Sequence, residues 1–503
     1  MKRLVVVSNR VPALGAAGAQ AGGLAVALEA LMEQRGGLWF GWSGRTEPAP
    51  SETPRRIDAG RVRYATLDLS PEEHDRYYNE FSNSTLWPLL HSMPELMTFD
   101  RRNALAYRGV NQRFTDALVP LLGTDDMIWI HDYHLMCMPA LLRAQDVRCP
   151  IGFFLHIPFP SPDVLASVPE AGALVRDLLA CDLIGFQTQN DLDNFAEAAV
   201  RLAGAERLSG NCLGIAWPDG TDHRVRLGAF PVEIEAREFA AIAEEAWRSL
   251  PTERLRRSLA GQQLILGVDR MDPTKGLVQR LAAYRRLLET RPQLHRRVTF
   301  LQIAAESRKD VIAYQDLRFQ VEKDAGGINS AFSEADWTPL RLIARAGARS
   351  TMAGYMREAR IGLVTPLRDG MNLVAKEYIA AQDPQDPGVL VLSKFAGAAR
   401  QLGSALLVNP YDTDEVADTL EQALAMGLQE RTERWHTCWA AIEDATALGW
   451  GHSFVAAMLR AVSGNEQRSQ LSPASLHTSV PTSGMRQTPD VRDTAVRRDI
   501  RML

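Results

Sequence analysis

Short runs of valine, isoleucine and leucine alternate with helix-like stretches along most of this 503-residue chain. We predict strands at residues 4–7, 127–130, 151–156, 182–187, 264–268, 298–303, 361–365 and 388–392. Strands that are apolar on both faces are typical of parallel sheets covered by helices on both sides. The alternation therefore predicts an α/β fold, with ligands at the carboxyl ends of the strands.

The series of strands pauses near residues 230–235 and restarts near residue 264. A chain of this length also exceeds one compact core. We therefore expect an N-terminal α/β domain at 1–235 and a second at 236–445, facing each other across a cleft. A C-terminal helix at 446–463 is expected to pack back towards the first domain. Residues 464–503 are rich in Ser, Thr, Pro and Gln, which predicts a disordered tail; an interaction segment is the alternative.

The composition is that of an ordinary globular protein. Hydrophobic residues make up 46% of the chain and charged residues 23%, with a net charge of −5, so we expect no nucleic-acid partner. The five cysteines include no CxxC pair and indicate free thiols in a reducing compartment. The apolar run at the N-terminus is too short for a signal peptide or membrane span, so we expect a cytoplasmic protein without a membrane partner.

The segment at residues 361–377 has the pattern of a phosphate site. A buried strand turns through Arg368-Asp369-Gly370 and enters a helix at about Asn372. The unpaired N–H groups of such a helix start suit an anion, best a phosphate. Asp369 and Glu377 flank it and can accept hydrogen bonds from a polyol. A diphosphate beside two carboxylates indicates a nucleotide sugar.

Cations follow two other predicted strands. Arg270 and Lys275 lie in the loop after the strand at 264–268, with Gly276 at the start of the next helix. Two fixed cations there would neutralise a diphosphate leaving group as its charge develops. A solvated loop is the alternative interpretation. Arg308 follows the strand at 298–303 in the same way.

The N-terminal half carries further candidates. Arg10 ends the first strand, and Gly22-Gly23 opens a helix where a backbone can approach a ligand closely. Tyr78 and Trp87 lie in an aromatic, amide-rich stretch that suits sugar binding. An ordinary turn and core aromatics are the alternatives.

Asp132 and His156 each follow a predicted strand and are expected to project into the cleft. Together with His131 and His134 they raise the question of a metal site. The two histidines lie in a strand-to-loop passage, not on one helix face, and no further ligand follows at a recognisable spacing. We therefore expect no metal.

These motifs together resemble the trehalose-6-phosphate synthases, a family of retaining glycosyltransferases with the GT-B fold of two facing Rossmann-like domains. The similarity runs from about Arg3 to Ala461. It is carried by VVVSNR, AGGL, GLWFGWSG, YYNEFSN followed by LWP, IWIHDYHL, GFFLHIPFPSP, LRDGMNLVAKEY and KFAGAA.

The resemblance implies a role for each candidate residue. The implied acceptor site for glucose 6-phosphate consists of Arg10, Tyr78, Trp87, Asp132 and Arg308. The implied site for a nucleoside-diphosphate glucose consists of Gly22, Gly23, Arg270, Lys275, Gly347, Asp369, Met371, Asn372, Leu373, Val374 and Glu377. The implied catalytic residues are Arg270, Lys275, Asp132 and His156.

The reaction implied by the family moves glucose to the anomeric hydroxyl of glucose 6-phosphate with retention, without a cofactor or metal. Front-face attack is expected, and Asp132 as a covalent nucleophile is the rival. The resemblance also implies a homo-oligomer and a separate phosphatase downstream. UDP-glucose is the expected donor.

The sequence departs from the family pattern at Arg270-Met-Asp-Pro-Thr-Lys275, at Ala305-Glu306 and around Gly347. These changes leave ADP- and GDP-glucose open as donors. A glucosylglycerol-phosphate synthase, a non-catalytic sugar-phosphate sensor and a sugar-nucleotide epimerase are the competing hypotheses. The aromatic pair and the intact charged residues argue against them.

Overall fold

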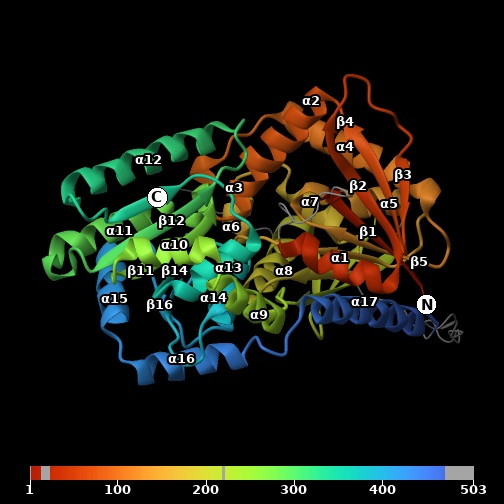
Figure 1. The fold of residues 1–503 in the computed structure, drawn as a ribbon. Helices are drawn as coiled ribbons and strands as arrows, with labels where there is room; N and C mark the ends of the chain where they lie inside the picture. The colour runs from red at the N-terminus through yellow and green to blue at the C-terminus, as the bar shows by residue number, and fades with distance from the viewer. Residues whose placement is uncertain (1, 13–22, 218–220, 471–503) are drawn as a thin grey trace, which may run out of the picture.

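The structure is a computed structural model that describes residues 2–12, 23–217 and 221–470, with only the backbone of residues 23–27 and 464–470. Gly22 and residues 471–503 of the expected tail lie outside the described residues. The described chain forms two lobes side by side, each built around one sheet (Figure 1).

The sheet of the first lobe has the strand order β3-β4-β2-β1-β5-β6-β7-β10-β9-β8. Its strands are β1 (Arg3–Arg10), β2 (Gly37–Thr46), β3 (Arg55–Ala59), β4 (Val62–Leu69), β5 (Asp126–His131), β6 (Ile151–Phe154), β7 (Leu183–Phe186), β8 (Glu206–Leu208), β9 (Cys212–Ala216) and β10 (Asp222–Ala229). The run from β4 to β10 is parallel, and antiparallel strands flank it. Val5 pairs with Ile128 and both are fully buried, as expected for a sheet covered on both faces.

The sheet of the second lobe has the order β13-β12-β11-β14-β15-β16 and is parallel throughout. Its strands are β11 (Gln263–Arg270), β12 (Val298–Ala305), β13 (Leu340–Ile343), β14 (Ile361–Val364), β15 (Val389–Ser393) and β16 (Leu406–Val408). All eight strands expected from the apolar runs are present in the two sheets, so the α/β prediction is confirmed.

Helices cover both sheets. Those between the strands of the first lobe are α1 (Gly23–Arg35), α2 (Pro71–Glu73), α3 (Trp87–Leu90), α4 (Arg101–Leu118), α5 (Met138–Ala144), α6 (Pro162–Leu165), α7 (Ala171–Leu178) and α8 (Gln189–Ala203). Those of the second lobe are α9 (Ala236–Trp247), α10 (Leu250–Leu259), α11 (Leu277–Thr290), α12 (Ile312–Phe332), α13 (Arg349–Glu358), α14 (Leu373–Ala381), α15 (Thr413–Ala425) and α16 (Leu428–Ala440). The helices expected after Gly22-Gly23, Gly276 and Asn372 are therefore present as α1, α11 and α14.

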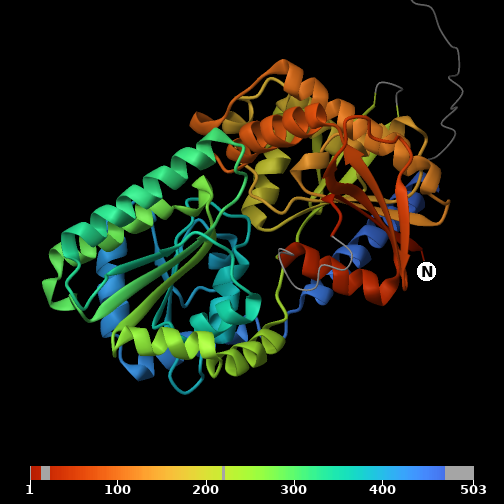
Figure 2. The ribbon, with the colours of Figure 1, turned by 45° about the horizontal axis from the view of Figure 1, so that its top comes forward.

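The last described helix, α17 (Ala447–Gln470), returns to the first lobe and runs beside α1 (Figures 1 and 2). Phe454 stacks on Trp129 of β5 at 4.5 Å between ring centroids, and it fills the space beside Gly152 and Gly185. The expected end of this helix at residue 463 is wrong, because it continues through residues 464–470. Glu466, Gln467 and Arg468 are good helix formers, so a polar composition there does not end the helix.

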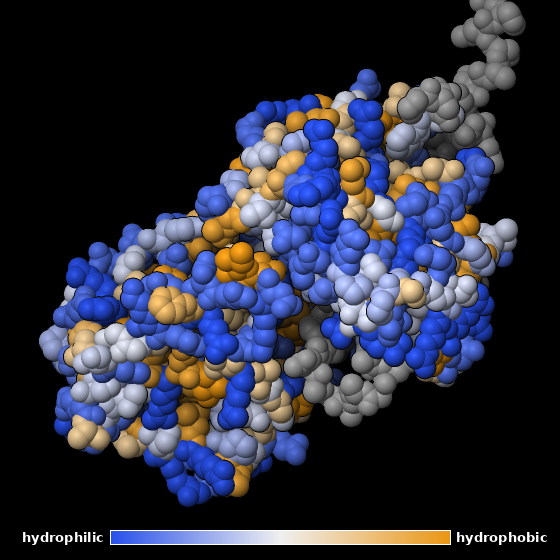
Figure 3. Space-filling view, turned by 90° about the horizontal axis from the view of Figure 1, so that it is seen from above, coloured by the Kyte–Doolittle hydropathy of each residue, from blue (hydrophilic) through white to orange (hydrophobic). Residues whose placement is uncertain are grey.

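The two lobes touch through few but specific contacts. Gly370 of the second lobe lies so close to the carbonyl oxygen of His156 that no Cβ fits there. The chain between the lobes is fixed by Lys376 of α14, whose Nζ donates to the carbonyl of Val232 at 2.9 Å and to Glu233 at 2.6 Å. Gly370 follows β14 and His156 follows β6, so the first of these contacts brings strand ends of the two sheets together. Figure 3 shows a hollow in the surface between the lobes.

Candidate active site

The second lobe contributes a charged cluster at the carboxyl ends of β11 and β14. Lys275 Nζ lies 2.5 Å from Asp369 Oδ2, and the side-chain amide of Asn372 donates to the same oxygen at 3.0 Å. Burial would raise the pKa of Asp369, but the Lys275 ammonium beside it holds that pKa below its ordinary value. The Asp369 carboxylate is therefore charged at neutral pH.

The start of α14 lies beside this cluster. Asn372 adopts a left-handed backbone, with φ of 72°, and its side chain accepts from the N–H of Ala375 at 3.2 Å as the N-cap. The N–H groups of Leu373 and Val374, in the first turn, have no partner within the helix. The sequence predicts an anion at these N–H groups. Met371, just before the cap, is buried in the core of the second lobe.

Arg270 and Arg308 both lie near the ring of Trp87, a residue of the first lobe. The Arg308 guanidinium stacks on the Trp87 ring at 3.9 Å, and Arg270 lies 5.7 Å from the same ring. Arg308 also donates to the hydroxyl of Tyr133 at 3.0 Å. The structure thus brings a cation from the end of β11 and one from beyond β12 against the same aromatic side chain.

Asp132 and His156 follow adjacent strands of the first sheet. Asp132 has φ of 75°, and its Oδ1 accepts from the backbone N–H of His156 at 3.2 Å. Burial raises the pKa of Asp132 to about 6, although backbone N–H groups and two arginines act against this. Burial also lowers the pKa of His156 to about 3. The imidazole is therefore neutral, and its Nε2 lies 3.0 Å from Nδ1 of His131.

Tyr78 and Arg10 lie further along the same edge. The ring of Tyr78 lies between His74 and His134, with centroids at 5.3 and 5.8 Å. Trp42 contacts Tyr78 at 5.6 Å and the Arg10 guanidinium at 5.8 Å. Arg10 is exposed at the end of β1, so its charge faces outward from an aromatic support.

The sequence predicts three further donor residues. Gly23 starts α1. Gly347 lies in the exposed loop between β13 and α13, with Met352 as its nearest side chain. Glu377 follows one turn after the start of α14, and burial raises its pKa to about 7, with Arg349 acting in the opposite direction. This carboxyl group is therefore close to half ionised at neutral pH.

Residues 4–460 match the model of glycosyltransferase family 20. The chain belongs to this family. A curated trehalose-6-phosphate synthase from Sinorhizobium fredii is 44% identical over 461 residues, which cover 90% of this chain and 98% of the relative. The family resemblance drawn from the motifs is thus confirmed, and the protein is a glycosyltransferase.

Solved structures of family members agree with the fold. An alpha,alpha-trehalose-phosphate synthase (UDP-forming) from Burkholderia xenovorans, in complex with glucose-6-phosphate, has a TM-score of 0.86 and 43% identity, covering 91% of this chain and 100% of that one. A structure from Escherichia coli bound with UDP-2-fluoro glucose has a TM-score of 0.85 and 43% identity, covering 91% and 98%. The predicted GT-B fold is therefore confirmed.

Sequence reasoning missed several residues of this glycosyltransferase site. Asp272 is fully buried and lies between the two arginines, and Tyr314 of α12 contacts it. His91 donates from Nδ1 to the carbonyl of Trp87 at 2.7 Å, and burial lowers its pKa to about 4. Only Asp272 had a local signal, because an aspartate before proline is typical of the residue that caps a helical turn.

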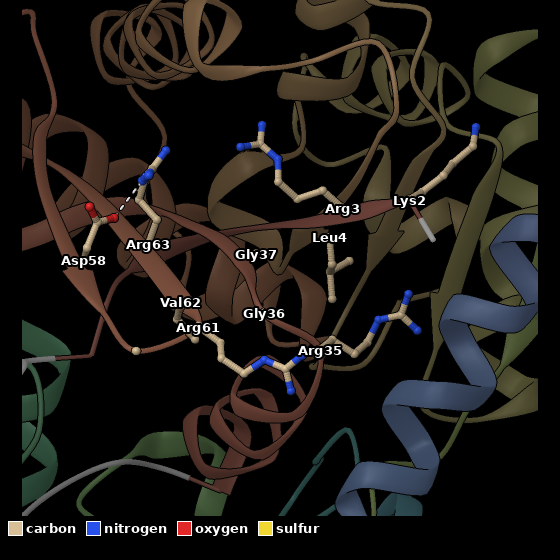
Figure 4. Close-up of a pocket in the computed structure, with 11 residues that line it drawn as sticks. Lys2, Arg3, Leu4, Arg35, Gly36, Gly37, Asp58, Arg61, Val62 and Arg63 are labelled. Atoms are coloured by element: carbon tan, nitrogen blue, oxygen red, sulfur yellow. Dashed lines mark hydrogen bonds and ion pairs between the residues drawn. The ribbon is translucent and has the colours of Figure 1, made fainter.

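A pocket on the first lobe lies at the opposite, amino end of its sheet, between the starts of β1, β2 and β4 (Figure 4). It measures about 720 Å³ and is lined by Lys2, Arg3, Arg35, Arg61 and Arg63 among others. Arg3 is bound to Asp126, Arg63 to Asp58, and Arg61 to the carbonyl of Gln34. Their side chains spread apart, and the hollow contains none of the predicted site residues.

Neither a metal-binding cluster nor a helix able to span a membrane is present among the residues that the structure describes. Within them, no three His, Cys, Asp or Glu side chains gather closely enough to hold a metal ion, and this includes the set around His131 and Asp132. No described helix is both long and apolar enough to cross a membrane.

Proposed function

We propose that this protein transfers glucose from UDP-glucose to glucose 6-phosphate with retention, giving α,α-trehalose 6-phosphate and UDP. The observation that carries the proposal is the meeting of two cation groups at one interface. Arg308 and Arg270 lie against Trp87 of the first lobe, and Lys275 pairs with Asp369 beside the start of α14. One group suits a sugar phosphate and the other a diphosphate. The ligands of the Burkholderia and Escherichia relatives support the same pair of substrates.

In the acceptor site, Arg308 and Arg10 would bind the phosphate of glucose 6-phosphate, with Tyr78 and Trp87 against the sugar. Arg308 is almost fully desolvated, with 9% of its side chain exposed, so its hydrogen bonds to phosphate are stronger than at a wet surface. The neutral His156 can accept from or donate to a sugar hydroxyl without placing charge beside the ring.

In the donor site, the N–H groups of Leu373 and Val374 would bind the diphosphate at the helix start. Asp369 would accept from the glucose hydroxyls, since Lys275 and Asn372 keep it charged and oriented. Glu377 would accept from the ribose. The exposed loop at Gly347 would contact the base.

The chemical step breaks the bond between the anomeric carbon and the diphosphate oxygen. We propose that the acceptor hydroxyl attacks from the same face, and that the departing phosphate oxygen takes its proton. Lys275 and Arg270 stabilise the charge that develops on this oxygen, which is the largest electrostatic demand of the reaction. No metal is required in this scheme, so added chelator should leave the rate unchanged.

The rival mechanism uses Asp132 as a covalent nucleophile. Its Oδ1 accepts from the N–H of His156, which orients the carboxylate for accepting a sugar hydroxyl in our scheme. Asp132→Asn combined with mass spectrometry of the wild type under turnover separates the two. A trapped glucosyl adduct on Asp132 in the wild type would overturn front-face attack.

The proposed function is tested by measuring nucleotide release from UDP-, ADP- and GDP-glucose with glucose 6-phosphate, and with glycerol 3-phosphate as the alternative acceptor. We expect UDP-glucose with glucose 6-phosphate to react fastest. Release only with glycerol 3-phosphate would show that the acceptor assignment is wrong while the donor half is retained. The product carries a phosphate, so a separate phosphatase must act to release free trehalose.

A further inference from the structure

Asp272 lies where the two halves of the site meet, and none of the proposed roles uses it. Its side chain is fully buried, and both carboxylate oxygens are engaged. A buried carboxylate is costly unless hydrogen bonds and cations surround it. Its partners therefore show what its charge is for.

The Oδ1 atom organises the donor side. It accepts from the backbone N–H of Thr274 at 3.0 Å and from the Thr274 hydroxyl at 2.9 Å. Asp272 thereby caps the single helical turn η5 (Pro273–Lys275), which ends at Lys275. The guanidinium of Arg270 lies 3.9 Å from the other carboxylate oxygen. One carboxylate thus fixes the loop that carries both donor-side cations.

The same side chain organises the acceptor side. Its Oδ2 accepts from the hydroxyl of Tyr314 at 3.0 Å and lies 3.9 Å from the Arg308 guanidinium. Tyr314 also accepts from Arg308, so the three groups form a closed triangle. From the first lobe, the Trp87 indole N–H lies 3.4 Å from Oδ1 and its ring stacks on Arg308.

The charge balance agrees with this arrangement. Burial would raise the pKa of Asp272, but Arg308 and Arg270 hold it well below its ordinary value. The carboxylate is therefore charged at any pH where the enzyme works. Its negative charge keeps two neighbouring guanidinium groups close together before any anionic substrate arrives.

We propose that Asp272 is a positioning residue that fixes the acceptor cation Arg308 relative to the donor cations Arg270 and Lys275. Loss of its charge therefore weakens both substrate sites together. The identity of the two substrates rests on the proposed function. Asp272 itself touches neither substrate in this account.

Asp272→Asn is the sharpest variant. Its remaining oxygen can still cap Thr274, while its NH₂ group faces the Tyr314 hydroxyl, which donates to Asp272, and two guanidinium cations. We expect the dissociation constants of UDP and of glucose 6-phosphate, titrated separately by calorimetry, each to rise at least roughly tenfold, the scale of one lost hydrogen bond to a charged group. Arg308→Lys should weaken glucose 6-phosphate alone.

Asp126→Asn is the matched control, because Asp126 is also a buried aspartate that binds an arginine, Arg3, but at the amino end of β5, away from the candidate site. It should lower the melting temperature without changing either dissociation constant. A change in only one dissociation constant for Asp272→Asn, or in neither, would overturn the proposal.

If Asp272→Asn does not fold, two milder variants decide. Thr274→Val removes one donor-side contact and should weaken UDP more, whereas Tyr314→Phe removes one acceptor-side contact and should weaken glucose 6-phosphate more. Unchanged affinities in both would overturn the role of Asp272. If the wild-type protein binds neither UDP nor glucose 6-phosphate, the proposed function is wrong and this inference is wrong with it. If the wild type binds both and the variants have the same dissociation constants, only the role of Asp272 is wrong.

Discussion

The two lobes contribute chemically different halves to the site. On the first lobe, His131, His134 and His156 are held neutral because burial lowers the pKa of each, and aromatic rings surround them. On the second lobe, Lys275 and Asp369 form a charged pair at the end of the sheet. Packing defines the first half, and paired charges define the second.

This difference corresponds to what each half must bind. A sugar has apolar ring faces and neutral hydroxyls, which suit neutral imidazoles and aromatic rings. A diphosphate leaving group needs fixed positive charge, which is most effective where water is excluded. Arg308 is the exception that joins the halves, because it extends from the second lobe against Trp87 of the first.

The largest effect is expected from removing packing behind the neutral half. Trp450 of α17 contacts Trp129 and Phe154 at 5.1 Å and lies beside His156. Trp450→Ala should lower the free energy of unfolding by about 3–5 kcal/mol, measured by denaturant titration. Trp247→Ala is the control, since Trp247 is 37% exposed and its loss should cost much less. Equal losses would show that the C-terminal helix does not support this half.

A substitution in the charged half should lower turnover and not stability. Lys275→Ala removes the cation beside the leaving group, and kcat is expected to fall about 10²–10³-fold, by analogy with loss of one transition-state donor. Lys309→Ala is the control, because Lys309 is exposed and pairs only with Glu306. A rate for Lys275→Ala within tenfold of the wild type would contradict the role of this cation.

The titration of Glu377 should be visible in donor binding on the charged half. The pKa of Glu377 is raised to about 7, so the neutral form dominates below that pH. A neutral carboxyl accepts poorly from a ribose hydroxyl. KM for UDP-glucose should therefore rise as the pH falls below 7, by up to about tenfold per pH unit. Glu377→Gln should have a higher KM at pH 8 that hardly changes with pH. A wild-type KM that stays flat from pH 5.5 to about 8 would argue against this contact.

The smallest effect is expected where charge is fully exposed. Arg148 and Asp146 form an ion pair on the first lobe with 85% and 86% of their side chains exposed. Arg148→Ala should leave both the denaturant midpoint and kcat within measurement error, because water screens such pairs. A measurable fall in the denaturant midpoint or in kcat would show that exposed charges on the first lobe contribute as well, and would contradict the contrast drawn between the two lobes.

Local patterns in the sequence were sufficient for most of the fold. Apolar runs revealed β1, β5 and β11, since a strand buried on both faces has a continuous signal. They missed β2, which glycines and tryptophans interrupt, and β3, whose side chains are mostly exposed and polar. They also gave no sign that Tyr78 lies in the π-helix η1 (His74–Leu86).

The positions of the candidate residues at strand ends were predictable from the sequence, but the contacts between them were not. Arg270, Lys275 and Asp369 follow strand ends, and the topology of parallel sheets brings such positions together. The contact between Trp87 and Asp272 joins residues 185 positions apart and depends on how one lobe meets the other. No local pattern encodes that, so the residue that links both halves was recognised only in the structure.

The most direct test of the account is the linkage of the product formed from UDP-glucose and glucose 6-phosphate, determined by NMR of both anomeric positions. We expect a single disaccharide phosphate with an α,α-1,1 linkage, because the charged half stabilises the leaving group on the face where the acceptor attacks. A product with a β-configured transferred glucose, or glucose released to water without any disaccharide, would contradict the account.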